Sequence, residues 1–93
     1  MSVSSSYRFI VTGRVQGVGF RAAAQGKALF LGLRGWVGNR ADGAVEGLVS
    51  GDEPAELEAF RAWLQKVPPA AQVERLEWSA TAEPADDGFL VRR

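Results

Sequence analysis

Hydrophobic and polar residues alternate along several short stretches, and two other stretches repeat apolar residues every three or four positions. Alternation is typical of a strand with one buried face, and the longer repeat is typical of an amphipathic helix. The pattern predicts strands at residues 7–14, 33–39, 44–50, 72–80 and 88–92. It predicts helices at residues 21–31 and from residues 51–54 to Val67, where Pro68 and Pro69 end the second helix.

The predicted order of elements is β-α-β-β-α-β with a short extra strand at the end. This order is the split βαβ, ferredoxin-like layout of an α+β fold. It predicts an antiparallel sheet with both helices packed on one face. We expect one domain over residues 7–93 and a flexible N-terminal tail over residues 1–6. In the sheet we expect the strand at 33–39 at the edge, next to the strand at 7–14.

Several residues at element ends and on apolar faces give finer predictions. Gly32 is expected to end the first helix as a C-terminal cap, and Asp52 is expected to cap the start of the second. Trp36 and Trp63 are predicted to lie in the core, whereas Trp78 is predicted to be half exposed.

The composition excludes several kinds of chemistry. The chain has 11 basic and 11 acidic residues, so it lacks the net positive charge of most nucleic-acid binders. It has no cysteine and no histidine, which excludes thiolate metal sites, cysteine nucleophiles and the commonest general base. It shows no secretory signal and no apolar run near the ~20 residues of a membrane span. We expect a cytoplasmic protein with neither nucleic-acid nor membrane partners.

The junction between the first strand and the first helix is the main candidate site. Such a junction leaves backbone N–H groups unpaired at the positive end of a helix dipole, where anions bind. Arg21 adds a forked guanidinium suited to phosphate oxygens. The spacing of Gly13, Gly17 and Gly19 is equally consistent with an anion-binding site and with a purely structural turn. It matches neither the Walker loop nor the dinucleotide fingerprint.

Two motifs then resemble the signatures of the acylphosphatase family. The first is Val11-x-Gly13-x-Val15-Gln16-Gly17-Val18-x-Phe20-Arg21. The second is Gly35-Trp36-Val37-x-Asn39, followed by Gly43, Val45 and Gly51. Gly38 departs from the family pattern, which has a longer and often basic side chain at this position.

The resemblance implies hydrolysis of the carboxyl–phosphate anhydride of small acyl phosphates, with inorganic phosphate as product and inhibitor. Arg21 and Asn39 are the implied catalytic residues: Arg21 stabilises charge on the phosphoryl group, and Asn39 holds the attacking water. The implied phosphate-binding residues are Val15, Gln16, Gly17, Val18, Gly19, Phe20 and Arg21. We expect no metal, no cofactor and a monomer. For this geometry Asn39 must face the loop at residues 15–20.

Other interpretations of the same residues remain open. The chain could be a phosphate-binding module without turnover, which the Gly38 departure favours. Asn39 precedes a turn, where asparagine is common for backbone reasons alone, and Gln16 could contact a ligand or brace the loop. A single-stranded RNA binder shares this strand order, but the strand at 44–50 lacks the aromatic residues such binders need.

Overall fold

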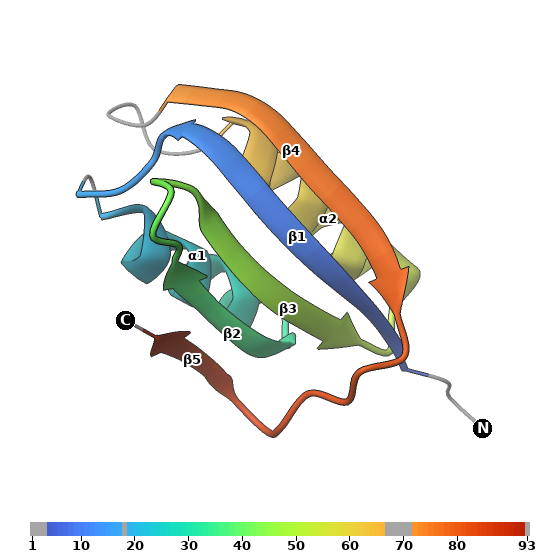
Figure 1. Ribbon diagram of the computed structural model, residues 1–93. Helices are drawn as coiled ribbons and strands as arrows, with labels where there is room; N and C mark the ends of the chain where they lie inside the picture. Colours follow the sequence, from blue (N-terminus) through green and yellow to red (C-terminus); the bar gives the residue numbers. More distant parts are fainter. Residues whose placement is uncertain (1–3, 18, 67–71, 93) are drawn as a thin grey trace.

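All the predicted helices and strands are present, in the predicted order (Figure 1). The structure, a computed structural model, describes residues 4–17, 19–66 and 72–92. Its elements are β1 (Ser5–Arg14), α1 (Phe20–Phe30), β2 (Arg34–Asn39), β3 (Val45–Gly51), α2 (Pro54–Lys66), β4 (Gln72–Thr81) and β5 (Phe89–Arg92). The strand β1 begins at Ser5, two residues before the predicted start, and residues 1–3 of the expected N-terminal tail lie outside the described residues.

The five strands form one sheet in the order β4-β1-β3-β2-β5. The pairs β1–β3, β1–β4 and β2–β3 are antiparallel, as predicted, whereas β5 pairs with β2 in parallel. The sheet is therefore mixed rather than wholly antiparallel. The reason is the connection before β5: it passes along one end of the sheet from the edge at β4 to the opposite edge (Figure 1). A strand that starts at that end must run opposite to β4, and hence in the direction of β2.

The predicted place of β2 was wrong. This strand lies neither beside β1 nor at the edge, because β3 separates it from β1 and β5 covers its other side. The helix α1 connects β1 to β2, which run in the same direction, and the hairpin then returns β3 into the gap between them. In that gap β3 makes antiparallel hydrogen bonds with both neighbours, so its backbone groups are satisfied on both sides.

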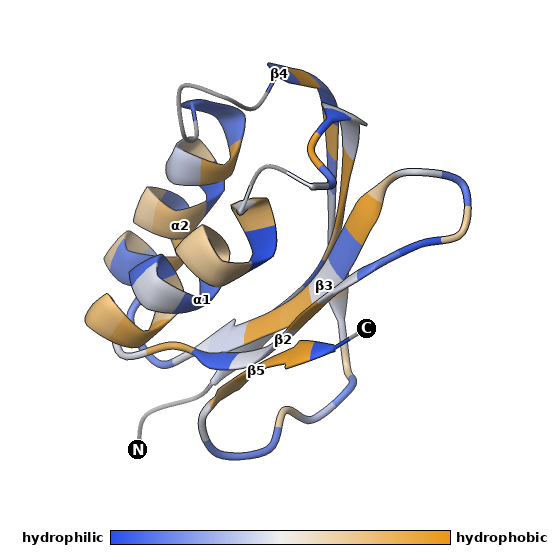
Figure 2. Cartoon of the chain, turned by 90° about the vertical axis from the view of Figure 1, so that its left-hand side faces the viewer, coloured by the Kyte–Doolittle hydropathy of each residue, from blue (hydrophilic) through white to orange (hydrophobic). Residues whose placement is uncertain are grey.

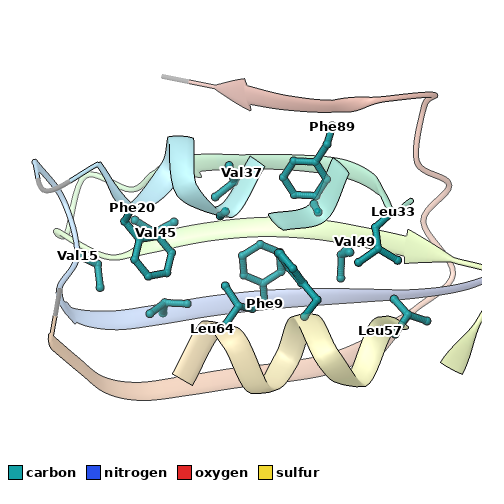
Figure 3. Packing of buried hydrophobic residues seen from close by; sticks show 14 residues of the cluster. Phe9, Val15, Phe20, Leu33, Val37, Val45, Val49, Leu57, Leu64 and Phe89 are labelled. Carbon is teal, nitrogen blue, oxygen red and sulfur yellow. The ribbon is translucent and has the colours of Figure 1, made fainter. Parts of the chain in front are cut away.

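The core lies between the helices and one face of the sheet, which form two layers (Figure 2). Its side chains come from every strand except β4, from both helices and from the connections before and after α1: Phe9, Val11, Val15, Phe20, Ala24, Ala28, Leu33, Val37, Val45, Val49, Leu57, Phe60, Leu64 and Phe89. The Phe60 ring packs against those of Phe9 and Phe89, at 5.7 and 6.0 Å between ring centroids. Figure 3 shows Phe9 and Phe89 pointing into this cluster. Gly47 on β3 is required there, because a Cβ at this position would collide with the Phe9 ring.

The prediction for Trp78 holds, that for Trp63 holds only in part because its side chain is partly buried, and that for Trp36 fails. Trp63 packs against the core beside Phe60, and Trp78 is half-buried and stacks on Tyr7 at 4.9 Å between ring centroids. Trp36 is not in the core. Its neighbour Val37 faces the helices, so alternation along β2 turns Trp36 to the opposite face of the sheet.

On that face Trp36 lies between two guanidinium groups. The Arg8 guanidinium is 5.5 Å from the Trp36 ring centroid, and that of Arg92 is 4.4 Å from it. Cation–π contacts of this kind stabilise a half-exposed indole.

The helix ends follow the sequence at α1 but not at α2. Gly32 has a φ of 74° and donates to the Leu29 carbonyl, while Leu33 donates to the Ala28 carbonyl, which confirms Gly32 as the residue that ends α1. Asp52 does not cap α2.

The Asp52 carboxylate instead accepts a 2.5 Å hydrogen bond from Ser4 and lies 3.6 Å from the Arg34 guanidinium. The Ser4 hydroxyl, with Arg34 beside it, holds the pKa of Asp52 below its ordinary value.

Candidate active site

The loop between β1 and α1 leaves the start of the helix open to a ligand. Gly17 and Gly19 have left-handed backbones with φ of 76° and 77°, which favour glycine. The helix begins at Phe20, one residue earlier than predicted, with no capping side chain and no acidic residue in its first turn. The first helical hydrogen bond runs from the Ala23 N–H to the Gly19 carbonyl. The N–H groups of residues 20–22 therefore precede the helical ladder, at the positive end of its dipole.

Gln16 braces this loop against the turn between β2 and β3. Its Nε2 donates to the carbonyl oxygens of Arg40 and Ala44, both at 2.9 Å. The same turn is closed by the Arg40 N–H, which donates to the Ala44 carbonyl at 2.8 Å. Of the two roles open to Gln16, the structure therefore shows the bracing one. It links the loop to the end of β2 although β3 lies between β1 and β2.

Asn39 lies on the same side of the sheet as the loop. It pairs with Val45, which pairs in turn with Val11, and both valines are fully buried beneath the helices. Residues paired across neighbouring strands project to the same face of a sheet. The Asn39 side chain therefore points to the helix side, at the end of the sheet where the chain leaves β1.

The Asn39 Oδ1 atom is buried and has no hydrogen-bond partner among the described residues. An unpaired buried acceptor costs about 1–3 kcal/mol, so a native protein retains one only for a reason. A role in the turn does not explain it, because Asp42 Oδ1 accepts the side-chain hydrogen bond of that turn, from the Ala44 N–H at 3.1 Å. This oxygen is available to accept a hydrogen bond from a bound molecule.

Arg21 is held by the C-terminal strand. Its Nη1 donates to the Arg92 carbonyl on β5 at 2.9 Å, and in the next turn of α1 Gln25 donates to the Phe89 carbonyl at 2.8 Å. A guanidinium has five N–H donors, and among the described residues only one hydrogen bond of the Arg21 guanidinium is made, to Arg92. Nothing in the local sequence around Arg21 indicated Arg92 as its partner, because the contact depends on where β5 joins the sheet.

A cavity of about 160 Å³ lies between the loop, the first turn of α1 and β5. Its lining residues are Val15, Gly17, Gly19, Phe20, Arg21, Ala22 and Val91. Five of these seven are among the predicted phosphate-binding residues. Gln16 serves as the brace, and Val18 lies outside the described residues. Nothing in the local sequence indicated that Ala22 or Val91 lines this cavity.

Gly38 is held on both sides within the sheet. It pairs with Glu46 on β3 and with Arg92 on β5, and it is buried. A Cβ at Gly38 would lie 3.2 Å from both the Cβ and the carbonyl oxygen of Arg92. The glycine therefore lets β5 approach closely, and the backbone of Arg92 fills the space of a longer side chain.

A larger cavity, of about 470 Å³, lies at the opposite end of the sheet. Its arginine, Arg34, already donates to Ser4 and lies beside Asp52. In the described ranges, no three histidine, cysteine, aspartate or glutamate side chains form a group that could hold a metal ion. None of the helices in those ranges is long and apolar enough to span a membrane.

Comparison with known proteins agrees with this geometry. Residues 7–91 match the family model named Acylphosphatase. "Acylphosphatase 2" of Ralstonia nicotianae is 50% identical over 93 residues, covering 97% of this chain and 97% of that protein.

Two solved structures share the fold closely. An acylphosphatase from Coxiella burnetii superposes with a TM-score of 0.90 at 35% identity, covering 96% of this chain and 93% of that one. An acylphosphatase from Bacillus subtilis superposes with a TM-score of 0.89 at 36% identity, covering 96% of this chain and 99% of that one. The family model that matches residues 7–91 and the 50% identity to the Ralstonia nicotianae protein show that the chain belongs to the acylphosphatase family.

Proposed function

The family activity is that of an acylphosphatase, a hydrolase acting on acid anhydrides. We propose that this site performs it by the following mechanism. Water attacks the phosphorus of a small acyl phosphate in line with the bond to the acyl oxygen. A new P–O bond forms from water as the old one breaks, giving a carboxylate and inorganic phosphate. The observation that supports this most directly is the buried, unpartnered Oδ1 of Asn39 on the same face as the open loop.

The loop and Arg21 bind the phosphoryl group. Phe20, Arg21 and Ala22, whose N–H groups precede the helical ladder of α1, line the same cavity. Phosphoryl transfer through a loose transition state depends on positioning and on stabilising the charge of the phosphoryl oxygens. Donors fixed in place before the reaction supply that stabilisation without reorganisation. The Arg92 carbonyl orients Arg21 for this purpose.

Asn39 positions the water. Its Oδ1 accepts one of the water's hydrogens, so that an oxygen lone pair faces the phosphorus. An amide is too weak a base to remove the proton completely, and a phosphoryl oxygen of the substrate receives it. The leaving carboxylate needs no proton, so the reaction proceeds without a general acid and the absence of histidine is no obstacle.

The expected setting of the activity is also part of this proposal. The substrate is a small acyl phosphate, and inorganic phosphate, the product, inhibits by occupying the same loop. The protein acts as a cytoplasmic monomer, without cofactor, metal, nucleic acid or membrane partner. A net charge of zero supports the expectation about nucleic acid.

Hydrolysis of benzoyl phosphate in the presence of a chelator tests the proposal. We expect turnover that survives chelation and is competitively inhibited by inorganic phosphate. Loss of turnover on chelation, restored by added metal, would contradict the metal-independent mechanism.

A second function remains to be tested against the first: a phosphate-binding module without turnover. The Gly38 departure favours it, although Gly38 is fully paired within the sheet. Phosphate binding measured by calorimetry, together with no hydrolysis of benzoyl or acetyl phosphate, would establish this alternative.

A further inference from the structure

The cavity at the start of α1 has an apolar side that phosphate binding does not use. Val91 on β5 lines the cavity and is 38% exposed, a large value for a valine in a sheet. It pairs with Val37, which faces the helices, so Val91 projects to the same face as the cavity. Ala22, in the exposed first turn of α1, also lines the cavity. Polar donors and exposed apolar groups therefore share one small space.

We propose that Val91, with Ala22 beside it, contacts the acyl group and makes the enzyme prefer acyl phosphates whose acyl group is apolar. This inference rests on the proposed function, because it assumes that the phosphoryl group occupies the loop. An acyl phosphate joins an anionic phosphoryl group to an acyl group only two bonds away. When the loop and Arg21 bind the phosphoryl oxygens, the atoms attached to the carboxyl carbon lie within reach of the cavity's apolar side.

The size of the cavity limits how strong the preference is. A volume of 160 Å³ equals about five water molecules of bulk liquid. It holds the phosphoryl group and the first atoms of the acyl group, and the remainder extends past the edge strand β5 into solvent. An apolar acyl group covers the exposed part of Val91 from water, which is favourable. A charged acyl group placed there would lose hydration without gaining a partner on Val91.

The adjacent Leu90 provides a matched control. It lies on the same edge strand and is 52% exposed, but it pairs with Trp36 and projects to the opposite face of the sheet. Truncation of either residue removes exposed apolar surface from β5, whereas only truncation of Val91 changes the cavity. A difference between the two variants therefore reports the acyl contact rather than the docking of the strand.

The experiment measures kcat and KM for benzoyl phosphate and acetyl phosphate with the wild type, Val91→Ala, Val91→Thr and Leu90→Ala. Benzoyl phosphate has the large apolar acyl group, and acetyl phosphate has the smallest. We expect Val91→Ala to lower kcat/KM for benzoyl phosphate about 3- to 10-fold, mainly through KM, and to change it less than about 2-fold for acetyl phosphate. Val91→Thr keeps the shape and the β-branch but replaces a methyl group with a hydroxyl. It should lower the ratio of kcat/KM for benzoyl phosphate to kcat/KM for acetyl phosphate, as Val91→Ala does.

Leu90→Ala should leave the ratio of the two kcat/KM values at its wild-type value. Equal losses for both substrates in the two Val91 variants would overturn the inference, because a purely structural role of Val91 lowers both alike. If the wild type hydrolyses both substrates and the ratio stays constant in these variants, only the inference fails. If the wild type hydrolyses neither, the proposed function fails as well.

Discussion

The two ends of the sheet each place an arginine beside a cavity, but the electrostatic surroundings differ. At the end near the N-terminus, Arg34 pairs with Asp52 and Ser4, and Ser6 donates to Ser50 at 3.0 Å. At the loop end, Arg21 donates to a backbone carbonyl, and the described residues place no carboxylate within ion-pair distance of it. The larger cavity is the one whose arginine is already paired with a carboxylate.

The difference shows which property marks a site in this molecule. At the cavity of 470 Å³, polar side chains already form hydrogen bonds with one another. The cavity of 160 Å³ adjoins the start of α1, which has no capping side chain. The Asn39 oxygen adds a second unsatisfied group at the loop end. Unpaired donors and acceptors held in fixed positions are what a reaction with developing charge requires.

The strongest test of this comparison is the removal of one arginine at each end. Arg21→Ala should lower kcat/KM for benzoyl phosphate by about 100-fold or more, the scale on which a charge-stabilising donor acts. It should also weaken inhibition by inorganic phosphate. Arg34→Ala, at the paired end, should leave both quantities near the wild-type values. Equal phosphate affinity in the wild type and Arg21→Ala would refute the role of the loop end.

Removal of the Asn39 amide should separate activity from stability. Asn39→Ala should lower kcat by about 100-fold through loss of the positioned water, with the inhibition constant of phosphate little changed. Because its Oδ1 lacks a partner, the free energy of unfolding should stay constant or rise by about 1 kcal/mol. Denaturant unfolding measures the second effect. A variant that no longer binds phosphate, yet turns over normally when saturated with substrate, would contradict the assignment.

The brace between the loop and the turn predicts a smaller effect. Gln16→Ala removes the hydrogen bonds to the carbonyls of Arg40 and Ala44, which should lower the free energy of unfolding by about 1–2 kcal/mol. It should lower kcat/KM by about 10-fold, because the loop is no longer held in a fixed position relative to Asn39.

Asp42→Ala is the matched control for Gln16, since it breaks a bond within the same turn but not the bond to the loop. It should reduce stability while keeping activity within about 2-fold of the wild type. Equal losses of activity in the two variants would mean that the turn, and not its link to the loop, is what matters.

The smallest expected effect is at the paired end. The pKa of Asp52 is lowered from 3.8, first by the Ser4 hydroxyl and then by Arg34. A lowered folded-state pKa stabilises the fold above pH 3.8 and loses that contribution as the pH falls through the folded value. An NMR titration of the Asp52 carboxyl carbon should give a midpoint below 3.8, and Ser4→Ala should raise it. A midpoint at 3.8 or above in the wild type would show that the pairing does not persist in solution.

Local patterns in the sequence predicted the elements well because each pattern reports on its own segment. Alternation located the strands, and Gly32 ended α1 as expected because the left-handed residue after a helix is a local requirement. The local pattern led to a wrong prediction at Trp36. The pattern shows that a residue is apolar but not which face of the strand it occupies, and in β2 it is Val37 that faces the core. Asp52 was expected to cap α2, but its carboxylate accepts a hydrogen bond from Ser4, a residue distant in the chain.

The sequence by itself determined the order of elements and the glycine-rich loop, and its motifs singled out Arg21 and Asn39 as the proposed catalytic residues. Only the tertiary structure decided that β3 lies between β1 and β2, that β5 joins in parallel, and that the Asn39 oxygen is buried without a partner. The physical reason is that periodicity sets the faces of a segment, whereas strand order, register and pairing arise from contacts between residues distant in the chain. Val91 reaches the cavity only through such a contact, more than 50 residues from its partner Val37.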